Sequence, residues 1–265
     1  MLNSLRNRIN CNTFASCKVI SLKIAMVKEL IVWAKGVVMS VADLLFPRYC
    51  FICGNRLTAS EEGLCNICMM SRPFAPLYSD NKENELARLF MGIFPIEKAQ
   101  AMMRYSSQSG LAQVIYEMKY YNKPELGMTL GRLCAKILKP SGFFNDIDLI
   151  VPVPLAKSRK RQRGYNQSEM IAEGISRATG IEVACDNVVR LHFKQSQTHL
   201  NERERRENVE GNFKIVDTSL FEGKHVLLVD DVVTTGATLK SCGGELAANV
   251  ANLRVSVFTI GRTAG

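Results

Sequence analysis

The sequence predicts an α/β fold in which helices flank a mainly parallel sheet, with a small cysteine-containing module before it. Three observations support this prediction. Helical and strand-like segments alternate from about Leu111 onward, as they do in parallel sheets covered on both faces. The run 226–229 is short and apolar and ends in two aspartates, which is typical of a buried central strand. Two C-x-x-C pairs lie upstream, within residues 50–68.

Residues 1–38 are a basic extension. The chain of 265 residues has a formal net charge of +9, of which residues 1–28 contribute five basic and no acidic side chains, so the rest carries only +4. The extension is an addition from an upstream start codon, a targeting peptide, or a segment whose residues 27–45 form a helix that packs on the body. The charges within residues 24–46 are too many for a membrane span. Since no convincing secretion signal appears, we expect a cytoplasmic protein.

Four cysteines are spaced as metal ligands within the next segment, residues 39–80. Cys50 and Cys53 form one C-x-x-C pair and Cys65 and Cys68 form another, with eleven residues between the pairs. Such pairs bring four thiolates around one tetrahedral Zn²⁺. Four protein ligands leave no open position for water, so the zinc would be structural. The alternative is a set of free or redox-active cysteines.

Residues 81–265 form the predicted α/β domain. Within it, apolar residues recur at helical spacing or gather in short runs. The predicted helices span residues 111–121, 126–138, 165–178 and 239–250, and the predicted strands span residues 148–154, 226–229 and 255–260. Cys134 and Cys242 fall in helical runs, so we expect them to be small core residues.

The strongest functional motif follows strand 226–229. Asp230 and Asp231 are expected at the carboxyl end of that strand, where open α/β sheets bind ligands. The next loop, 234–238, reads Thr-Thr-Gly-Ala-Thr and opens onto a predicted helix. Free backbone N–H groups and threonine hydroxyls at a helix N-terminus suit a phosphate. Carboxylates and a phosphate cradle a few residues apart predict a phosphorylated ribose as ligand.

Two other interpretations fit part of this motif. A strand ending in two aspartates also occurs in nucleotide hydrolases, but these need an upstream G-x-x-x-x-G-K-[ST] loop, which the sequence lacks. Alternatively, the carboxylates only cap the following helix. The complete loop in register with the acidic pair favours the phosphoribosyl interpretation.

Two polar stretches lie between the predicted strands. Residues 158–167 hold four cations in five positions, and we predict that they clamp a pyrophosphate, with Arg163 the main contact. A solvated turn or a nonspecific nucleic-acid patch is the alternative. Residues 197–208 are rich in opposed charges and predict an exposed helix, a mobile loop, or a lid over the substrate.

These motifs together resemble a known family. The acidic pair and its loop are similar to the phosphoribosyl-pyrophosphate (PRPP) motif of type I phosphoribosyltransferases. The full series resembles the ComF family, also called ComFC or double zinc-ribbon phosphoribosyltransferase-like proteins. The motifs that carry this resemblance are the cysteine pairs after Leu-Phe-Pro-Arg, Lys119-Tyr120, Pro152-Val-Pro-Leu155, Arg163-Gly-Tyr-Asn-Gln167, Gln197-Thr198, Arg205-x-x-Asn208 and the acidic-pair loop.

The resemblance implies roles for these residues. Asp230 and Asp231 would contact the ribose hydroxyls and favour a cationic sugar ring, and the loop would bind the 5′-phosphate, with Arg163 and Arg205 as further substrate contacts. The loop residues concerned are Thr234, Thr235, Gly236, Ala237 and Thr238.

A PRPP-binding, phosphoribosyltransferase-type enzyme that uses Mg²⁺ and has an unknown acceptor is therefore expected, with a link to DNA uptake in natural transformation. The alternative is a non-catalytic PRPP or nucleotide sensor, or an adaptor that binds single-stranded DNA or a DNA-uptake helicase. Release of pyrophosphate would distinguish the two.

Overall fold

The computed structural model describes Val27, Ala34 and residues 45–70, 84–106, 109–191 and 212–263. Most of the basic extension, including nearly all of the predicted helix at 27–45, lies outside the described residues. So does the polar stretch 197–208.

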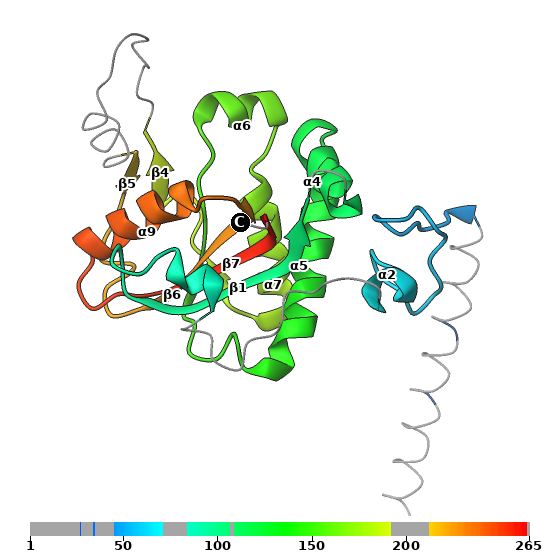
Figure 1. Ribbon diagram of the computed structural model, residues 1–265, viewed down its shortest axis with the longest axis horizontal. Coiled ribbons are helices and arrows are strands. Elements are labelled where there is room, and N and C mark those ends of the chain that lie inside the picture. Colours follow the sequence, from blue (N-terminus) through cyan, green and yellow to red (C-terminus); the bar gives the residue numbers. More distant parts are fainter. Residues whose placement is uncertain are drawn as a thin grey trace, which may run out of the picture.

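A five-stranded parallel sheet forms the centre of the molecule, in the order β1-β7-β6-β2-β3 (Figure 1). Its strands are β1 (Ile96–Tyr105), β2 (Leu149–Pro152), β3 (Glu182–Val183), β6 (His225–Val233) and β7 (Arg254–Thr263). Parallel neighbours require crossover connections, which the intervening helices supply. A separate antiparallel pair consists of β4 (Val188–Arg190) and β5 (Phe213–Ile215).

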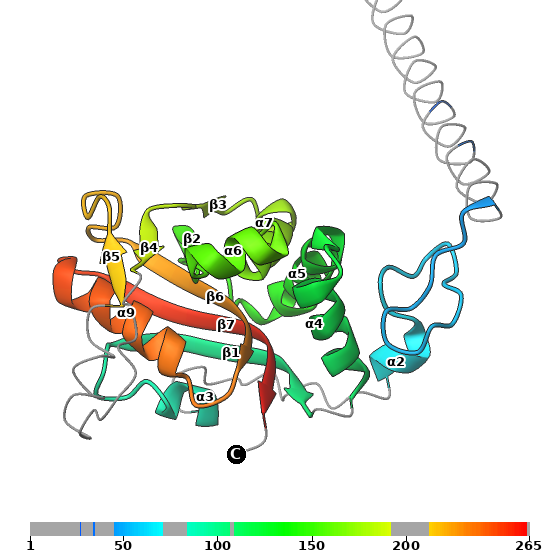
Figure 2. The ribbon, with the colours of Figure 1, turned by 90° about the horizontal axis from the view of Figure 1, so that it is seen from above.

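Helices cover both faces of the sheet (Figure 2). Leu227 and Val229 of β6 pack into one core together with side chains of α4 (Gly110–Tyr120), α5 (Pro124–Leu138) and α7 (Gln167–Thr179). Val226 and Leu228 alternate with them and pack on the other face, against α3 (Glu85–Arg88) and α9 (Ala237–Asn249). The remaining elements are α2 (Asn66–Met70), the 3-10 helix η1 (Lys139–Ser141) and α6 (Lys157–Arg163).

The structure confirms the predicted α/β class and mainly parallel sheet, and a helix or strand occupies each span predicted within residues 111–260. Cys134 and Cys242 are buried, as predicted for core residues. Among the described helices, none combines the length and the apolar character needed to cross a membrane.

Strand β6 is longer than the predicted 226–229, because it pairs with two neighbours of different length. Its pairing with β2 ends at Val229, opposite Pro152, whereas its pairing with β7 continues to Val233. Asp230 and Asp231 thus belong to the strand and still lie beyond the end of β2. The sequence predicts the pair at the carboxyl end of its strand, whereas it lies within β6, a few residues before Val233, and past the end of β2.

Other elements also differ from the prediction. The basic stretch forms the helix α6, and α7 begins at Gln167 rather than 165 because the Asn166 side chain caps it by accepting from Ser168 N. Strand β1 was not predicted at all. Its polar side chains, among them Lys98 and the buried Gln100, interrupt the apolar pattern that marks a strand.

Glycines allow α5 and α7 to pack in direct backbone contact. A Cβ atom at Gly131 would lie 2.1 Å from the Ile171 carbonyl oxygen, and one at Gly174 would lie 2.1 Å from the Met128 carbonyl oxygen. Neither backbone can move without shifting a whole helix. The close approach fixes α7, and α7 begins at the site described below.

We predict that Gly174→Ala lowers the free energy of unfolding by about 1–3 kcal/mol or more, because the added methyl overpacks the α5–α7 contact. Gly244→Ala in α9 is the matched control, since its Cβ would meet only Ile93 at an ordinary 3.5 Å. There the better helix propensity of alanine should stabilise the protein by up to about 1 kcal/mol. Urea unfolding of both variants measures the difference, and equal stabilities would contradict the packing argument.

Candidate functional site

Protein donors surround the acidic pair at the end of β6. Asp230 Oδ1 accepts hydrogen bonds from Ser168 Oγ at 2.9 Å and from the Asp231 backbone N–H at 2.9 Å. Asp231 Oδ2 lies 2.8 Å from Lys119 Nζ, and its Oδ1 accepts from the Val232 N–H at 2.6 Å. The site therefore gathers α4, the start of α7 and β6.

One aspartate of the pair, Asp230, has a raised pKa. Burial, followed by repulsion from Asp231, raises the pKa of Asp230 to about 7, although the hydrogen bonds from Asp231 and Ser168 and the charge of Lys119 act in the opposite direction. Asp230 therefore keeps its proton to a higher pH than an ordinary aspartate does. Such a pair can accept hydrogen bonds from vicinal hydroxyls and stabilise a cationic ring, with Lys119 balancing part of its charge.

The Thr/Gly loop forms a pocket beside Asp230. Gly236 has φ +75° and is the N-cap of α9, a helix of 13 residues. This left-handed conformation favours glycine, and a Cβ here would also approach Phe90 to 3.4 Å. The pocket holds about 130 Å³ and is lined by Asp230 and residues 232–239. A loop that turns sharply into a helix N-terminus is suited to a phosphate.

The segment Arg163-Gly-Tyr-Asn-Gln167 binds the rest of the protein through polar contacts. The Tyr165 hydroxyl and Gln167 Nε2 both donate to the Met118 carbonyl oxygen. Asn166 Nδ2 donates to the Val153 carbonyl oxygen at 3.0 Å. The segment thereby ties the end of α4 and the end of β2 to the start of α7, where Ser168 contacts the acidic pair.

Arg163, the predicted pyrophosphate contact, already has protein partners. Its Nη1 donates to Gln167 Oε1 at 2.8 Å, and its guanidinium lies 5.6 Å from the ring centre of Tyr120. Its role toward a ligand stays a prediction. Arg205, the other predicted arginine, lies outside the described residues.

Arg190 was not singled out from the sequence, yet it lies in the field of the acidic pair. Burial and the nearby Arg159 lower the pKa of Arg190, while Asp230 raises it. Its guanidinium rests 5.4 Å from the Phe213 ring centre, across the β4–β5 pair. No local pattern indicated this position, because β4 precedes Asp230 by some forty residues and only the fold brings them close.

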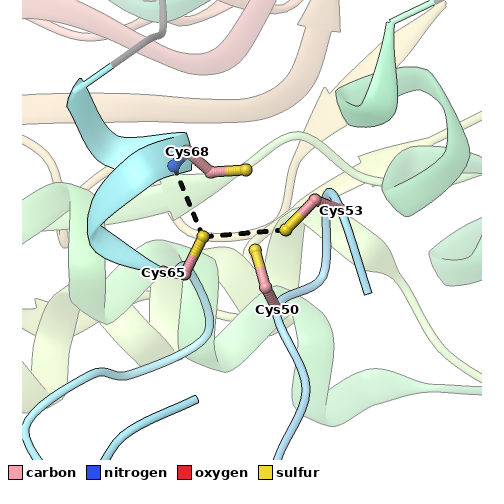
Figure 3. A group of neighbouring side chains, drawn as sticks. All are labelled: Cys50, Cys53, Cys65 and Cys68. Atoms are coloured by element: carbon pink, nitrogen blue, oxygen red, sulfur yellow. Dashed lines mark hydrogen bonds between the residues drawn. The ribbon is translucent and has the colours of Figure 1, made fainter. Parts of the chain in front are cut away.

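The four cysteines predicted as metal ligands do come together (Figure 3). Their sulfur atoms all lie within 4.8 Å of one another, and those of Cys53 and Cys65 are 3.6 Å apart. Two sulfurs on a tetrahedral zinc with bonds of about 2.3 Å would be about 3.8 Å apart. The arrangement is compatible with a structural zinc site.

The thiol chemistry also suits a cation. Burial opposes ionisation of Cys50, but backbone hydrogen bonds lower its pKa to about 7. Burial and the neighbouring thiols raise the pKa of Cys68 to about 12. Four sulfurs so close cannot all become thiolates unless a positive ion balances them, so a divalent cation fits this group.

The cysteine segment packs on α5. The buried cysteines share a small core with Leu133 of α5, and Glu62 forms ion pairs with Arg132 and with Lys136, the latter at 2.8 Å. A Cβ at Gly63 would lie only 2.9 Å from the Thr129 methyl group. The same helix α5 therefore supports both the cysteine cluster and, through α7, the acidic pair.

We predict that Cys65→Ser removes stoichiometric zinc and lowers the midpoint of thermal unfolding, because a structural metal contributes folding free energy. Cys185→Ser, which changes an exposed cysteine outside the cluster, should leave both unchanged. Atomic absorption and thermal melts provide the measurements. Purified wild type without bound metal would contradict the zinc assignment.

Comparisons with known proteins agree with this geometry. The family model described as the phosphoribosyl transferase domain matches residues 119–258. The DNA utilization protein YhgH of Salmonella typhimurium is 26% identical over 230 residues, which cover 83% of this chain and 99% of the relative. Competence protein F of Haemophilus influenzae is 29% identical over 199 residues, covering 72% of this chain and 86% of the relative.

A third relative shares a shorter region. Competence protein ComFC of Bacillus subtilis is 34% identical over 116 residues, which cover 43% of this chain and 45% of the relative. The family model spans the acidic pair, its loop and the basic helix, and the relatives are of the competence type. The chain belongs to the phosphoribosyl transferase domain family, and its relatives are consistent with the predicted ComF type.

Proposed function

We propose that this protein binds PRPP and acts as a phosphoribosyltransferase-type protein linked to the handling of DNA taken up by the cell. The observation that carries this proposal is the pocket of the Thr/Gly loop, which opens beside Asp230 near the carboxyl end of the central strand β6. The printed names of the relatives, DNA utilization protein and competence protein, support the link to DNA.

The proposed binding mode assigns each group one task. The loop 234–238 holds the 5′-phosphate at the start of α9, far from the reacting carbon, where it contributes binding energy. Asp230 and Asp231 accept hydrogen bonds from the ribose hydroxyls. When pyrophosphate leaves and positive charge develops on the ring, the same carboxylates stabilise it.

The leaving group requires positive charge. Helix α6 carries five cations among its seven residues, none of them buried, and Arg190 adds another near Asp230. Mg²⁺ would neutralise pyrophosphate charge when bound, and carboxylate oxygens such as those of the acidic pair are the ligands it prefers. The residues present thus fit a substrate that arrives with its metal.

The Asp230→Asn/Asp231→Asn double variant should bind PRPP with Mg²⁺ at least about 100-fold more weakly than wild type, because both hydroxyl acceptors lose their charge. The matched control is Glu173→Gln/Asp217→Asn, which removes one partly exposed and one exposed carboxylate away from the pocket. Titration calorimetry on folded, zinc-loaded protein measures both. Equal PRPP affinities of the two variants would contradict the site assignment.

Turnover is a separate question with its own assay. A transferase releases pyrophosphate once its acceptor is present, whereas a sensor binds PRPP without consuming it. Pyrophosphate release by wild type, lost in the double variant, is the outcome expected for an enzyme. Tight PRPP binding without release across candidate acceptors would favour the sensor.

A surface next to the site supports a second activity, the binding of single-stranded DNA. Tyr116, Tyr120 and Tyr121 are 50–60% exposed. The ring centre of Tyr116 lies 4.8 Å from that of Tyr120 and 5.9 Å from that of Tyr121. The Arg163 guanidinium lies over one ring, and Gly164 borders an open depression of about 450 Å³ lined also by three residues of α6. Aromatic rings beside a cationic groove are the usual means of binding single strands.

We expect Tyr116→Ala/Tyr120→Ala to weaken binding of an oligothymidine by roughly 10-fold or more, because each stacked base contributes about 1–3 kcal/mol. An abasic oligomer of equal length should bind both wild type and this variant weakly and alike. Lys139→Gln/Lys224→Gln, which removes exposed lysines away from α6, serves as the charge control. Fluorescence anisotropy measures the affinities, and stacking is ruled out if wild type binds the abasic strand as tightly as it binds the oligothymidine.

A further inference from the structure

Lys119 covers one half of the acidic pair. It belongs to the last turn of α4, and its Nζ lies 2.8 Å from Asp231 Oδ2. The side chains of Lys119 and Asp231 are only 25% and 11% exposed. The second oxygen of Asp231 accepts a hydrogen bond from the Val232 N–H at 2.6 Å. Both carboxylate oxygens of Asp231 are thus occupied by the protein itself.

Asp230 differs from Asp231 in its access to a ligand. It lines the pocket of the Thr/Gly loop, and both Ser168 Oγ and the Asp231 N–H donate to the same oxygen, Oδ1. A sugar in the pocket would therefore meet one accessible carboxylate and one covered by an ammonium group. To bind a second hydroxyl, Asp231 must give up Lys119.

The backbone of Lys119 is held in place while its side chain is long. The preceding carbonyl, that of Met118, accepts from both Tyr165 and Gln167, and the next side chain, Tyr120, packs under Arg163. Helix α4 therefore cannot withdraw from the site. Any release of Asp231 must come from movement of the lysine side chain, and the residue after Lys119, Tyr120, contacts Arg163 at the end of α6.

Resting on the proposed function, we propose that Lys119 exchanges Asp231 for the pyrophosphate of the substrate. The ribose hydroxyls donate hydrogen bonds to the Asp231 carboxylate, and the released Lys119 ammonium forms an ion pair with the pyrophosphate. One ion pair replaces another, so no partly buried charge is left unpaired. A ribose 5-phosphate offers the hydroxyls but no second anion, so it leaves Lys119 without a partner. Lys119 thereby makes the site select pyrophosphate-bearing ribose.

The test compares two ligands across three variants. Lys119→Gln should weaken PRPP binding by roughly 10- to 100-fold, the loss of one charge-assisted contact, and leave ribose 5-phosphate binding unchanged or stronger. Lys119→Arg keeps the cation and should retain most of the preference. Lys123→Gln is the matched control, because Lys123 follows the same helix and forms a similar ion pair, 2.7 Å from Glu117. It should bind both ligands as wild type does.

Titration calorimetry with Mg²⁺, on variants whose melting curves match wild type, gives every affinity. If Lys119→Gln weakens the binding of both ligands equally, Lys119 only orients Asp231 and the proposed exchange does not occur. If neither ligand is affected, or if wild type binds both equally tightly, the inference also fails while the proposed phosphoribosyl site stands. If wild type binds neither ligand, the proposed function itself fails and the inference with it.

Discussion

The unequal ends of neighbouring strands are the constraint on which the site depends. The Val153 N–H donates to the Val229 carbonyl oxygen at 2.9 Å, and the pairing of β2 with β6 ends there. Strand β6 nevertheless continues along β7 to Val233. The aspartates are therefore rigidly held on one side and open on the other, where Ser168 and Lys119 reach them.

On the side where β2 has ended, one connected set of contacts surrounds the aspartates. The Met118 carbonyl oxygen receives two side-chain donors from the start of α7, and the close α5–α7 packing at Gly131 and Gly174 fixes that helix. Helix α5 in turn carries the cysteine cluster through Leu133. A module that shares no residue with the acidic pair is thus coupled to it through the packing of two helices.

The sequence identified the parts of the site that are contiguous. The acidic pair and loop at 230–238, and the cysteine pairs, could be recognised because the spacing of their residues along the chain is itself the signal. Ser168 and Arg190 could not be recognised, since nothing in their own neighbourhoods refers to Asp230. Lys119 was recognised as part of a family motif but without a role, because its partner Asp231 is more than a hundred residues away.

By itself the sequence determined the class of fold, the helices of the second half, the acidic pair with its Thr/Gly loop and the cluster of four cysteines. Each depends on local periodicity or on residues a few positions apart, which the chain expresses directly. The tertiary structure decided that β6 extends past β2, that the basic stretch is a helix, that β1 is a strand despite its polar residues, and that Asp231 is paired with Lys119. These follow from which neighbours each segment meets, because strand pairing and burial are settled only when distant segments pack together.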